Sequence, residues 1–273
     1  MKIYVFITLY NTNLIPLCYE KQADKVFLLD NGKCDINAND LPSIYVYVKN
    51  EKNLGLSSAF DKVLLTNEFQ DDDFLLFFDQ DSVIPDLFIH NLIKSFEKVE
   101  QEYNIGLIGG FFKDSNTNND SKRRIKRKIS EGIYVVPTLI TSSMLTRYKY
   151  LKKVGFWNEA YFLDLADFEL SFRYRRNGLN CAVDENVVFT HTLGENISGK
   201  EHYLNPFRYY YIIRESTKML FERINFFDKS HFLFDLFFYP ISIVLFEDKK
   251  GERLKYYFKG LSHGINKING ELK

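Results

Sequence analysis

Residues 74–83 read FLLFFDQDSV, five apolar residues followed directly by Asp79-Gln80-Asp81. An apolar run of this length is typical of a parallel strand that is covered on both faces. Open α/β sheets bind their ligands beyond the carboxyl ends of such strands. Two carboxylates at positions i and i+2 can converge there on one hard cation, although isolated pairs are also common as solvated loop acids. The stretch predicts a buried central strand, with a metal site as the functional interpretation of its end.

Outward from this stretch, β-branched and aromatic runs predict further strands at residues 3–9, 26–30, 44–48 and 105–111. Residues 55–68 and 86–103 have helical periodicity, and Pro85 marks the start of the second helix. Strands that alternate with helices predict an α/β fold with a mostly parallel sheet. A further strand is expected at residues 133–140 and a further helix at residues 167–177.

We expect a catalytic domain over residues 1–205, in two halves that meet near residue 112, and a helical C-terminal region over residues 206–273. Within that region, residues 252–268 have the single apolar stripe of an amphipathic helix. The longest apolar stretch, residues 232–246, is interrupted by Asp235 and Pro240. We expect this stretch, at fifteen residues, to be too short to span a bilayer. It would instead pack as core or lie on a membrane surface.

The composition is that of an ordinary globular chain: 273 residues, 45% hydrophobic and 26% charged, with 36 Lys and Arg against 36 Asp and Glu. This excludes a disordered chain and a uniformly basic nucleic-acid binder. The charge is unevenly spread, since residues 1–112 hold 17 acidic and 9 basic side chains, whereas the remainder is basic. Three cysteines at no paired spacing, Cys18, Cys34 and Cys181, fit reduced thiols in a cytoplasmic protein better than a disulfide scaffold.

Residues 113–130 interrupt the alternation with a polar run, in which positions 122–128 hold six basic residues out of seven. We expect a surface loop here. The basic run is either a solvated face or a region attracted to an anionic lipid surface or a lipid-diphosphate acceptor.

A second charged group lies in FLDLADFELSFR at residues 162–173, which contains Asp164, Asp167, Glu169 and Arg173. Asp167 would lie in the first turn of the predicted helix, where the helix dipole favours its ionised form. A carboxylate held in this way can accept a proton from an attacking hydroxyl. The alternative is an acidic first turn that only caps the helix. His191 follows another short strand, and a single histidine is more often structural than a ligand.

Several short motifs follow one another in a fixed order along the chain. They are Thr8-Leu9-Tyr10-Asn11, Asp30-Asn31-Gly32, Asn53-Leu54-Gly55, Asp79-Gln80-Asp81-Ser82, Thr141-Ser142-Ser143, Gly155-Phe156-Trp157-Asn158-Glu159, Asp164 to Glu169 with Arg173, and His191 followed by Gly194. This ordered set resembles the inverting glycosyltransferases of family 2, and most closely the bacterial rhamnosyltransferase-like branch. The resemblance covers roughly residues 3–270.

The resemblance implies a GT-A fold, in which a nucleotide-binding α/β layer is joined to an acceptor-binding half. It implies a nucleotide-sugar pocket lined by Tyr10, Asn11, Asp30, Asn53, Asp79 and Gln80. Asp81 would hold a divalent cation, Mn2+ or Mg2+, on the diphosphate, and His191 would complete the metal or diphosphate site. Asp167 would be the catalytic base. The acceptor side would be formed by Ser142, Ser143, Trp157, Asp164, Glu169 and Arg173.

Three features depart from the family pattern. The segment between the first two strands is short and contains Pro16, so the first helix must be abbreviated. Asp61 stands where Asn is usual, and Ser143 replaces the usual Gly of the acceptor loop. The first two bear on the nucleotide contacts and the third on the acceptor contacts.

The implied function is the inverting, metal-dependent transfer of a sugar from dTDP-rhamnose or a UDP-hexose to a glycan or lipid-linked acceptor in bacterial surface polysaccharide synthesis. The expected location is the cytoplasm, with peripheral contact to the inner face of an anionic membrane and a homodimer both left open. No nucleic-acid partner is expected.

Two other functions were weighed. A haloacid-dehalogenase-like phosphatase would use Asp79 as its nucleophile, but three strands precede that residue and the chain lacks the Gly-Asp dipeptide expected of that superfamily. A catalytically inactive glycosyltransferase-like partner subunit is the second, and the intact acidic residues argue against it.

Overall fold

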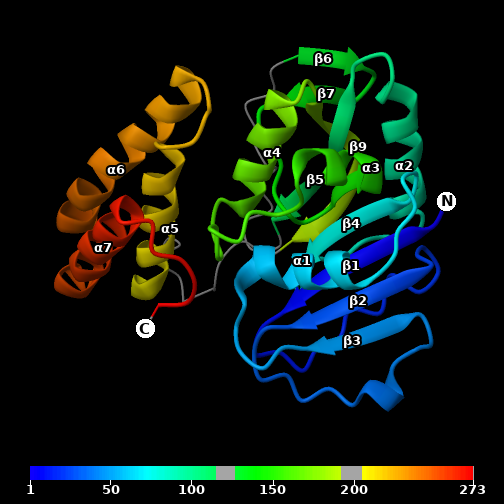
Figure 1. The fold of residues 1–273 in the computed structure, drawn as a ribbon, viewed down its shortest axis with the longest axis horizontal. Coiled ribbons are helices and arrows are strands. Elements are labelled where there is room, and N and C mark those ends of the chain that lie inside the picture. The colour runs from blue at the N-terminus through cyan, green and yellow to red at the C-terminus, as the bar shows by residue number, and fades with distance from the viewer. Residues whose placement is uncertain (115–126, 192–204, 273) are drawn as a thin grey trace.

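The computed structural model describes residues 1–114, 127–191 and 205–272, which form a nine-stranded sheet with helices on both faces (Figure 1). In chain order the elements are β1 Ile3–Leu9, β2 Lys25–Asp30, the short 3-10 helix η1 Ala38–Asp40, β3 Tyr45–Lys49, α1 Gly55–Thr66, β4 Phe74–Asp79, α2 Phe88–Val99, β5 Ile105–Asp114, β6 Arg127–Ser130, β7 Ile133–Val136, β8 Met144–Arg147, α3 Tyr148–Val154, α4 Ala166–Arg176, β9 Asn180–His191, α5 Pro206–Met219, α6 Phe226–Phe246 and α7 Lys250–Ile265.

The sheet has the strand order β3-β2-β1-β4-β8-β5-β9-β7-β6. Strands β1 to β4 pair in parallel, with Leu9 beside Asp30 and Thr8 beside Asp79, so their carboxyl ends lie at one edge. Strand β8 runs antiparallel between β4 and β5, and β7 runs antiparallel to β9. The predicted α/β class is therefore confirmed; the first four strands form the parallel part and the rest of the sheet is mixed.

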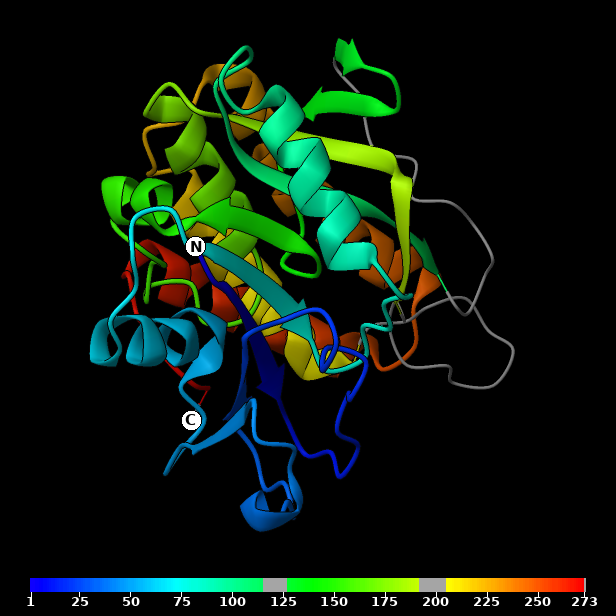
Figure 2. The same ribbon diagram turned by 90° about the vertical axis from the view of Figure 1, so that its right-hand side faces the viewer.

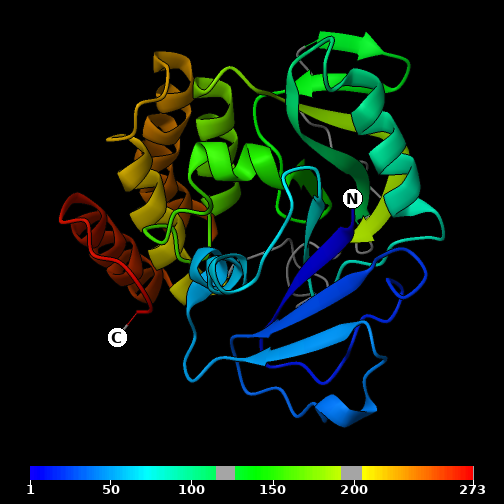
Figure 3. The ribbon, with the colours of Figure 1, turned by 45° about the vertical axis from the view of Figure 1, so that its right-hand side comes forward.

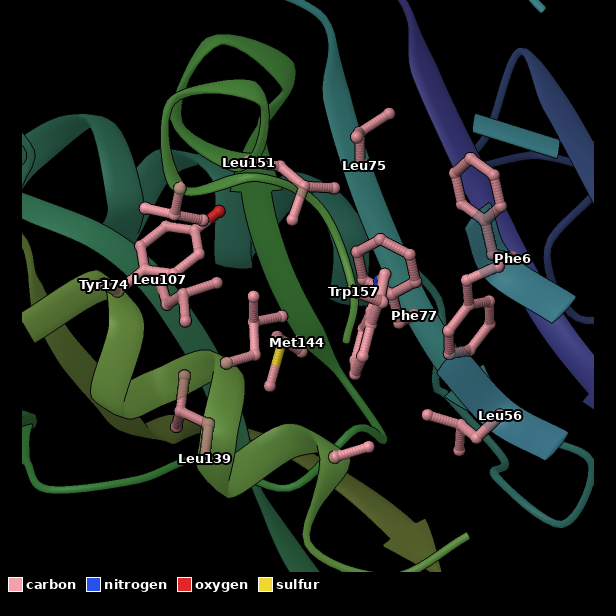
Figure 4. Close-up of a cluster of buried hydrophobic side chains, with 14 of the residues drawn as sticks. Phe6, Leu56, Leu75, Phe77, Leu107, Leu139, Met144, Leu151, Trp157 and Tyr174 are labelled. Atoms are coloured by element: carbon pink, nitrogen blue, oxygen red, sulfur yellow. The ribbon is translucent and has the colours of Figure 1, made fainter. Parts of the chain in front are cut away.

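Two hydrophobic layers enclose the sheet. Helices α1, α3 and α4 cover one face, where Trp157 packs between Phe60 of α1 and Phe77 of β4 (Figure 4). Helix α2 covers the opposite face with an apolar side that includes Phe88 and Phe96, and it stands in front of the sheet in Figure 2. Because β4 is covered on both sides, its residues 74–78 are all buried, as its apolar sequence predicted.

Helices α5, α6 and α7 form a separate group beside α4, at the end of the molecule away from β3 (Figure 3). Two glycines of α7 allow it to lie directly against α5. A Cβ on Gly260 would come within 2.6 Å of the Tyr210 carbonyl oxygen, and one on Gly264 within 2.5 Å of the Thr217 Cβ. The predicted helical C-terminal region is therefore present, and it packs closely on itself.

Several predicted boundaries need correction. Residues 10–24 form turns with no helix, because Pro16 and the short connection leave no room for one. The strand predicted at residues 133–140 ends at Val136. Within the predicted surface loop 113–130, the first two residues extend β5 and the last four form β6. The basic residues of that loop lie mostly outside the described residues.

The apolar stretch 232–246 belongs to a longer helix than expected. Helix α6 continues through Pro240 and has 21 residues, so by length and composition it is long and apolar enough to cross a membrane. The expectation that this segment is too short was therefore wrong. Only 17% of its most apolar window is buried, which also contradicts the interpretation that the stretch packs mainly as core.

Candidate active site

The ends of β1, β2 and β4 bring polar residues together at the carboxyl edge. The backbone N–H of Tyr10, directly after β1, donates to Gln80 Oε1 at 2.7 Å, which ties β1 to the Asp79-Gln80-Asp81 turn. Asn11 has a left-handed backbone, with φ of 49°. Gly32, which follows β2, lies against Asn11, and a Cβ at this position would come within 2.5 Å of the Asn11 backbone nitrogen. Only glycine fits there.

Asp30 is fully buried beneath this edge. Its carboxylate accepts hydrogen bonds from the Tyr47 hydroxyl at 2.6 Å and from the Gly32 N–H at 2.8 Å. Burial acts to raise the pKa of Asp30, but these hydrogen bonds outweigh it and hold the pKa below the usual value. The residue is therefore ionised, and its hydrogen bond with Gly32 fixes the turn after β2.

Asn31 is a residue whose role sequence reasoning missed. It is buried, it accepts a hydrogen bond from Asn50 Nδ2 at 2.9 Å, and it donates to the Gly55 carbonyl at 2.8 Å. Asn53 accepts a hydrogen bond from the Gly55 N–H at 2.9 Å. Together these amides fix the start of α1 beside the edge; Asn31 stood inside the Asp30-Asn31-Gly32 motif, but nothing in its spacing identified this bridging role.

Two consecutive residues hold two carboxylates of the candidate site. The Ser142 hydroxyl donates to Asp79 Oδ2 at 2.6 Å, and the Thr141 N–H donates to Asp167 Oδ2 at 3.0 Å. Ser82 in turn donates to Ser142 Oγ at 3.0 Å. The turn that precedes β8 thus joins Asp79, at the end of β4, to Asp167, at the start of α4.

Asp167 lies in the first turn of α4, as predicted, but it is not held in the ionised form. Burial raises the pKa of Asp167 to about 7, and the nearby carboxylates of Asp79 and Asp164 add to the shift. Hydrogen bonds from Thr141 and Phe168 oppose the shift without cancelling it. The expected stabilisation by the helix dipole is therefore outweighed, and Asp167 can both take and release a proton near neutral pH.

Asp164 is the second acid of this region. Its Oδ1 accepts a hydrogen bond from Arg208 Nη2 of α5 at 3.2 Å. Its Oδ2 lies inside the protein and has no hydrogen-bond partner within the described ranges. Burial raises the pKa of Asp164 even though Arg208 acts against the shift. One carboxylate oxygen near Asp167 is thus buried without a hydrogen bond from the described residues.

The other predicted acceptor-side residues make contacts inside the protein. Ser143 is buried with φ of 71°, a conformation that favours glycine, and its hydroxyl accepts a hydrogen bond from the Gly110 N–H at 3.0 Å. Trp157 is part of the core. Glu169 is buried and pairs with Arg173 at 2.7 Å, while Arg173 also donates to the carbonyl of Phe156. These contacts favour a positioning role for Ser143, Trp157, Glu169 and Arg173 over the predicted direct contact with an acceptor.

Asp61, where an Asn was expected, lies away from the strand ends. It accepts a hydrogen bond from the Trp157 N–H at 3.1 Å, and burial raises the pKa of Asp61 to about 7. This hydrogen bond joins α1 to the segment after α3, and it involves none of the residues at the ends of β1, β2 and β4.

The predicted metal residues Asp81 and His191 come from neighbouring backbone segments. Val83 and Thr190 form an antiparallel bridge with N···O distances of 2.9 and 3.0 Å, which places the end of β9 beside the Asp79-Gln80-Asp81 turn. Within the ranges that the structure describes, no three His, Cys, Asp or Glu side chains gather as a complete metal site. Two carboxylates on one turn nevertheless provide the hard oxygen donors that Mg2+ or Mn2+ takes when a substrate diphosphate supplies the remaining ligands.

Solved structures share this fold at low sequence identity. GalNAc-T7 with UDP, GalNAc and Mn2+ matches 98% of this chain and 56% of its own, with a TM-score of 0.60 and 10% identity. TarS of S. aureus matches with a TM-score of 0.54 and 16% identity, over 98% of this chain and 49% of its own. The mannosyltransferase PcManGT of Pyrobaculum calidifontis, in complex with GDP-Man and Mn2+, matches with a TM-score of 0.55 and 12% identity. The match covers 99% of this chain and 76% of that protein. These neighbours confirm the predicted GT-A fold class.

The chain spans about half the length of the first two of these proteins. A comparison with curated protein sequences gives no significant match. The family model "Glycosyl transferase family 2" matches residues 5–155, which is more than half of the chain and includes the ends of β1, β2 and β4. The chain therefore belongs to glycosyl transferase family 2.

Proposed function

We propose that this chain is an inverting glycosyltransferase that moves a sugar from a nucleotide-sugar donor to an acceptor hydroxyl, with Asp167 as the catalytic base. The observation that supports this proposal is the Thr141–Ser142 turn. Its two residues hold the carboxylates of Asp79 and Asp167, so a donor at the strand ends and a base at α4 share one support.

In this proposal the acceptor hydroxyl oxygen attacks the anomeric carbon of the donor sugar. The bond from that carbon to the phosphate oxygen breaks, and its electron pair leaves with the nucleoside diphosphate. Asp167 takes the hydroxyl proton, for which a pKa of about 7 is well matched. A single displacement from the side opposite the leaving group inverts the configuration at the carbon.

Asp81 would hold a divalent cation, Mn2+ or Mg2+, His191 would complete the metal or diphosphate site, and Asp79 would contact the nucleotide sugar. When bound, such a cation stabilises the negative charge that develops on a departing diphosphate. GalNAc-T7 and PcManGT are structures that contain Mn2+ with nucleotide ligands, which supports this proposal. Tyr10, Asn11 and Gln80 would contact the nucleotide from the same edge, while Asp30 and Asn53 would shape its pocket from below.

For the substrates, we propose dTDP-rhamnose or a UDP-hexose as donor and a glycan or lipid-linked oligosaccharide as acceptor, in bacterial surface polysaccharide synthesis in the cytoplasm. Asp164 and Ser142 would lie on the acceptor side, where the Ser142 hydroxyl already holds the Asp79 carboxylate. A homodimer and a rhamnosyltransferase-like specificity stay predictions.

The test is a thermal-shift screen of nucleotide sugars, with and without Mn2+, followed by calorimetry. A ligand at about 100 times its Kd adds about 2.7 kcal/mol to the free energy of unfolding, which such a screen detects. We expect a shift that requires Mn2+ and that disappears in Asp81→Asn. No binding of any nucleotide sugar would overturn the proposal in favour of an inactive partner subunit, and phosphate release from simple phosphomonoesters would favour the phosphatase.

A further inference from the structure

Helix α6 exposes a continuous apolar surface along its whole length. Ten of its large apolar side chains are exposed, among them Phe227, Phe234, Phe237, Ile241 and Leu245. Their spacing of three, four and seven positions places them on one side of a helix that is about 30 Å long. Phe227 is 85% exposed and Phe237 is 66% exposed. A contiguous apolar surface that is exposed to solvent in this way marks an interaction site.

The opposite side of α6 is fixed to the protein. Phe232, Leu236 and Ile243 are its buried residues. Leu236 and Ile243 belong to the hydrophobic cluster of the C-terminal helices, and the ring of Phe232 packs edge-on against Phe172 of α4. The helix therefore has one face on the protein and one face in solvent, as an amphipathic surface helix has.

A contact from α7 compensates for Pro240 in the middle of α6. Proline has no N–H, so the Leu236 carbonyl four residues earlier loses its helical donor. The Tyr257 hydroxyl of α7 donates to that carbonyl at 2.7 Å. At the other end of α6, Asp228 pairs with Arg175 of α4 at 3.0 Å. These two contacts hold α6 lengthwise against α4 and α7, so that it presents its side rather than its end.

Basic residues border the apolar surface. Arg223 and Lys229 lie near its start, and Lys249 and Lys250 lie three and four positions after its last residue, Phe246. Residues 206–273 contain 12 Lys and Arg against 8 Asp and Glu. Two of those acids beside the surface, Glu247 and Asp248, are ion-paired with Arg253 at 3.3 and 2.7 Å. Arg253 offsets the charge of one of these two acids, and the positive balance of the region comes from Lys249, Lys250 and the other basic residues of 206–273.

We infer that the exposed side of α6 is a membrane-docking surface that lies in the plane of an anionic lipid bilayer. Its aromatic and aliphatic side chains enter the boundary between headgroups and acyl chains, and the flanking lysines and arginines contact anionic headgroups. Such binding depends on both the buried apolar area and the lipid charge. This inference is independent of the proposed function, because it needs neither donor nor acceptor.

The test is flotation of the full chain with phosphatidylcholine vesicles and with vesicles that also contain phosphatidylglycerol. We compare the parent protein with Phe234→Gln/Phe237→Gln and with the control Leu14→Gln/Leu65→Gln. The control removes two leucines of similar exposure, 80% and 68%, from elsewhere on the surface. We expect the parent and the control to float strongly only with phosphatidylglycerol, and the α6 variant to lose at least about tenfold in partitioning, given the apolar area removed.

Equal flotation of the α6 variant and the parent would overturn the inference, as would a parent that stays unbound to either vesicle. Sedimentation velocity without lipid tests the other occupant: a parent dimer that becomes a monomer in the α6 variant would assign the surface to a second copy of the chain. Alkaline carbonate extraction of native membranes separates the orientations, since a helix lying in the plane is released and a spanning helix is retained.

Discussion

Asp167 in α4 and Glu215 in α5 are two buried carboxyl groups that differ in the charged side chains beside them. Burial raises the pKa of each to about 7, and each accepts hydrogen bonds from backbone N–H groups. Glu215 is held by the Arg214 guanidinium at 2.8 Å and accepts from the Phe162 N–H at 2.8 Å. The carboxylate of Asp164 raises the pKa of both groups, but the other charged neighbour of Asp167 is the carboxylate of Asp79, whereas that of Glu215 is the Arg214 guanidinium.

This difference teaches that a raised pKa alone does not identify a catalytic base. Glu215 has a cation beside it and ties α5 to the segment before α4, so its charge serves the packing of the C-terminal helices. Asp167 has no such cation among its principal electrostatic neighbours and lies beside the residue at the end of β4. The position of Asp167 beside the end of β4, together with its pKa, supports the proposal that it is the base, whereas the contacts of Glu215 support a structural role.

The largest expected effect separates the two groups by activity. Asp167→Asn should lower turnover by about a thousandfold, because general-base catalysis typically contributes 100-fold to 10,000-fold. Its stability should change by less than about 1 kcal/mol, since the loss of one hydrogen-bond acceptor opposes the removal of a buried charge. Release of nucleoside diphosphate measures turnover, and calorimetry should show near-normal donor binding. Turnover within about tenfold of the parent would show that another group is the base.

The next effect concerns stability. Glu215→Ala leaves Arg214 buried without its carboxylate, which typically costs about 3–5 kcal/mol. Glu215→Gln keeps an acceptor oxygen for Arg214 and the Phe162 N–H but loses the charge, so it should cost less than Glu215→Ala. Urea unfolding measures both, and turnover per folded molecule should stay within about tenfold of the parent in each. If Glu215→Ala were as stable as the parent, the ion pair would not be what secures α5.

The smallest effects are in pH dependence, and here the two groups act in opposite directions. In the proposed mechanism Asp167 acts in its ionised form, so kcat/KM should rise with pH up to about 7 and then level off. Glu215 has a folded-state pKa of about 7, above its ordinary value of 4.5, so its contribution to stability falls as pH rises from about 4.5 to about 7. Melting temperatures against pH should show less of this fall in Glu215→Gln, whereas the rate profile of that variant should match the parent.

The sequence was sufficient for the parts of the fold that depend on local pattern. The apolar run before Asp79, the other strands of the parallel part and the place of Asp167 in its helix were predicted, because burial on both faces and helix starts leave local signals. Strand β8 was not predicted: its four residues, MLTR, are too few to show a period, and its place between β4 and β5 depends on distant partners. The pKa of Asp167 also depends on burial that only the folded chain creates.

The C-terminal helices were harder to predict for a different reason. Pro240 ordinarily signals the end of a helix, and the donor that compensates for it, Tyr257, lies 17 positions later in the chain. The buried pair of Arg214 and Glu215 likewise shows no spacing that marks it out, because its partners lie in the segment before α4.

The contact between Tyr257 and Leu236 also determines where the chain can be shortened. A truncation that keeps α6 but removes α7 would leave the Leu236 carbonyl without its donor and would uncover Leu236 and Ile243 on the second side of an already apolar helix. Such a fragment would be prone to aggregate, and its behaviour would say nothing about the intact surface. Because α7 also lies directly against α5, deletion series should treat α5, α6 and α7 as one unit and end before Pro206, where α5 begins.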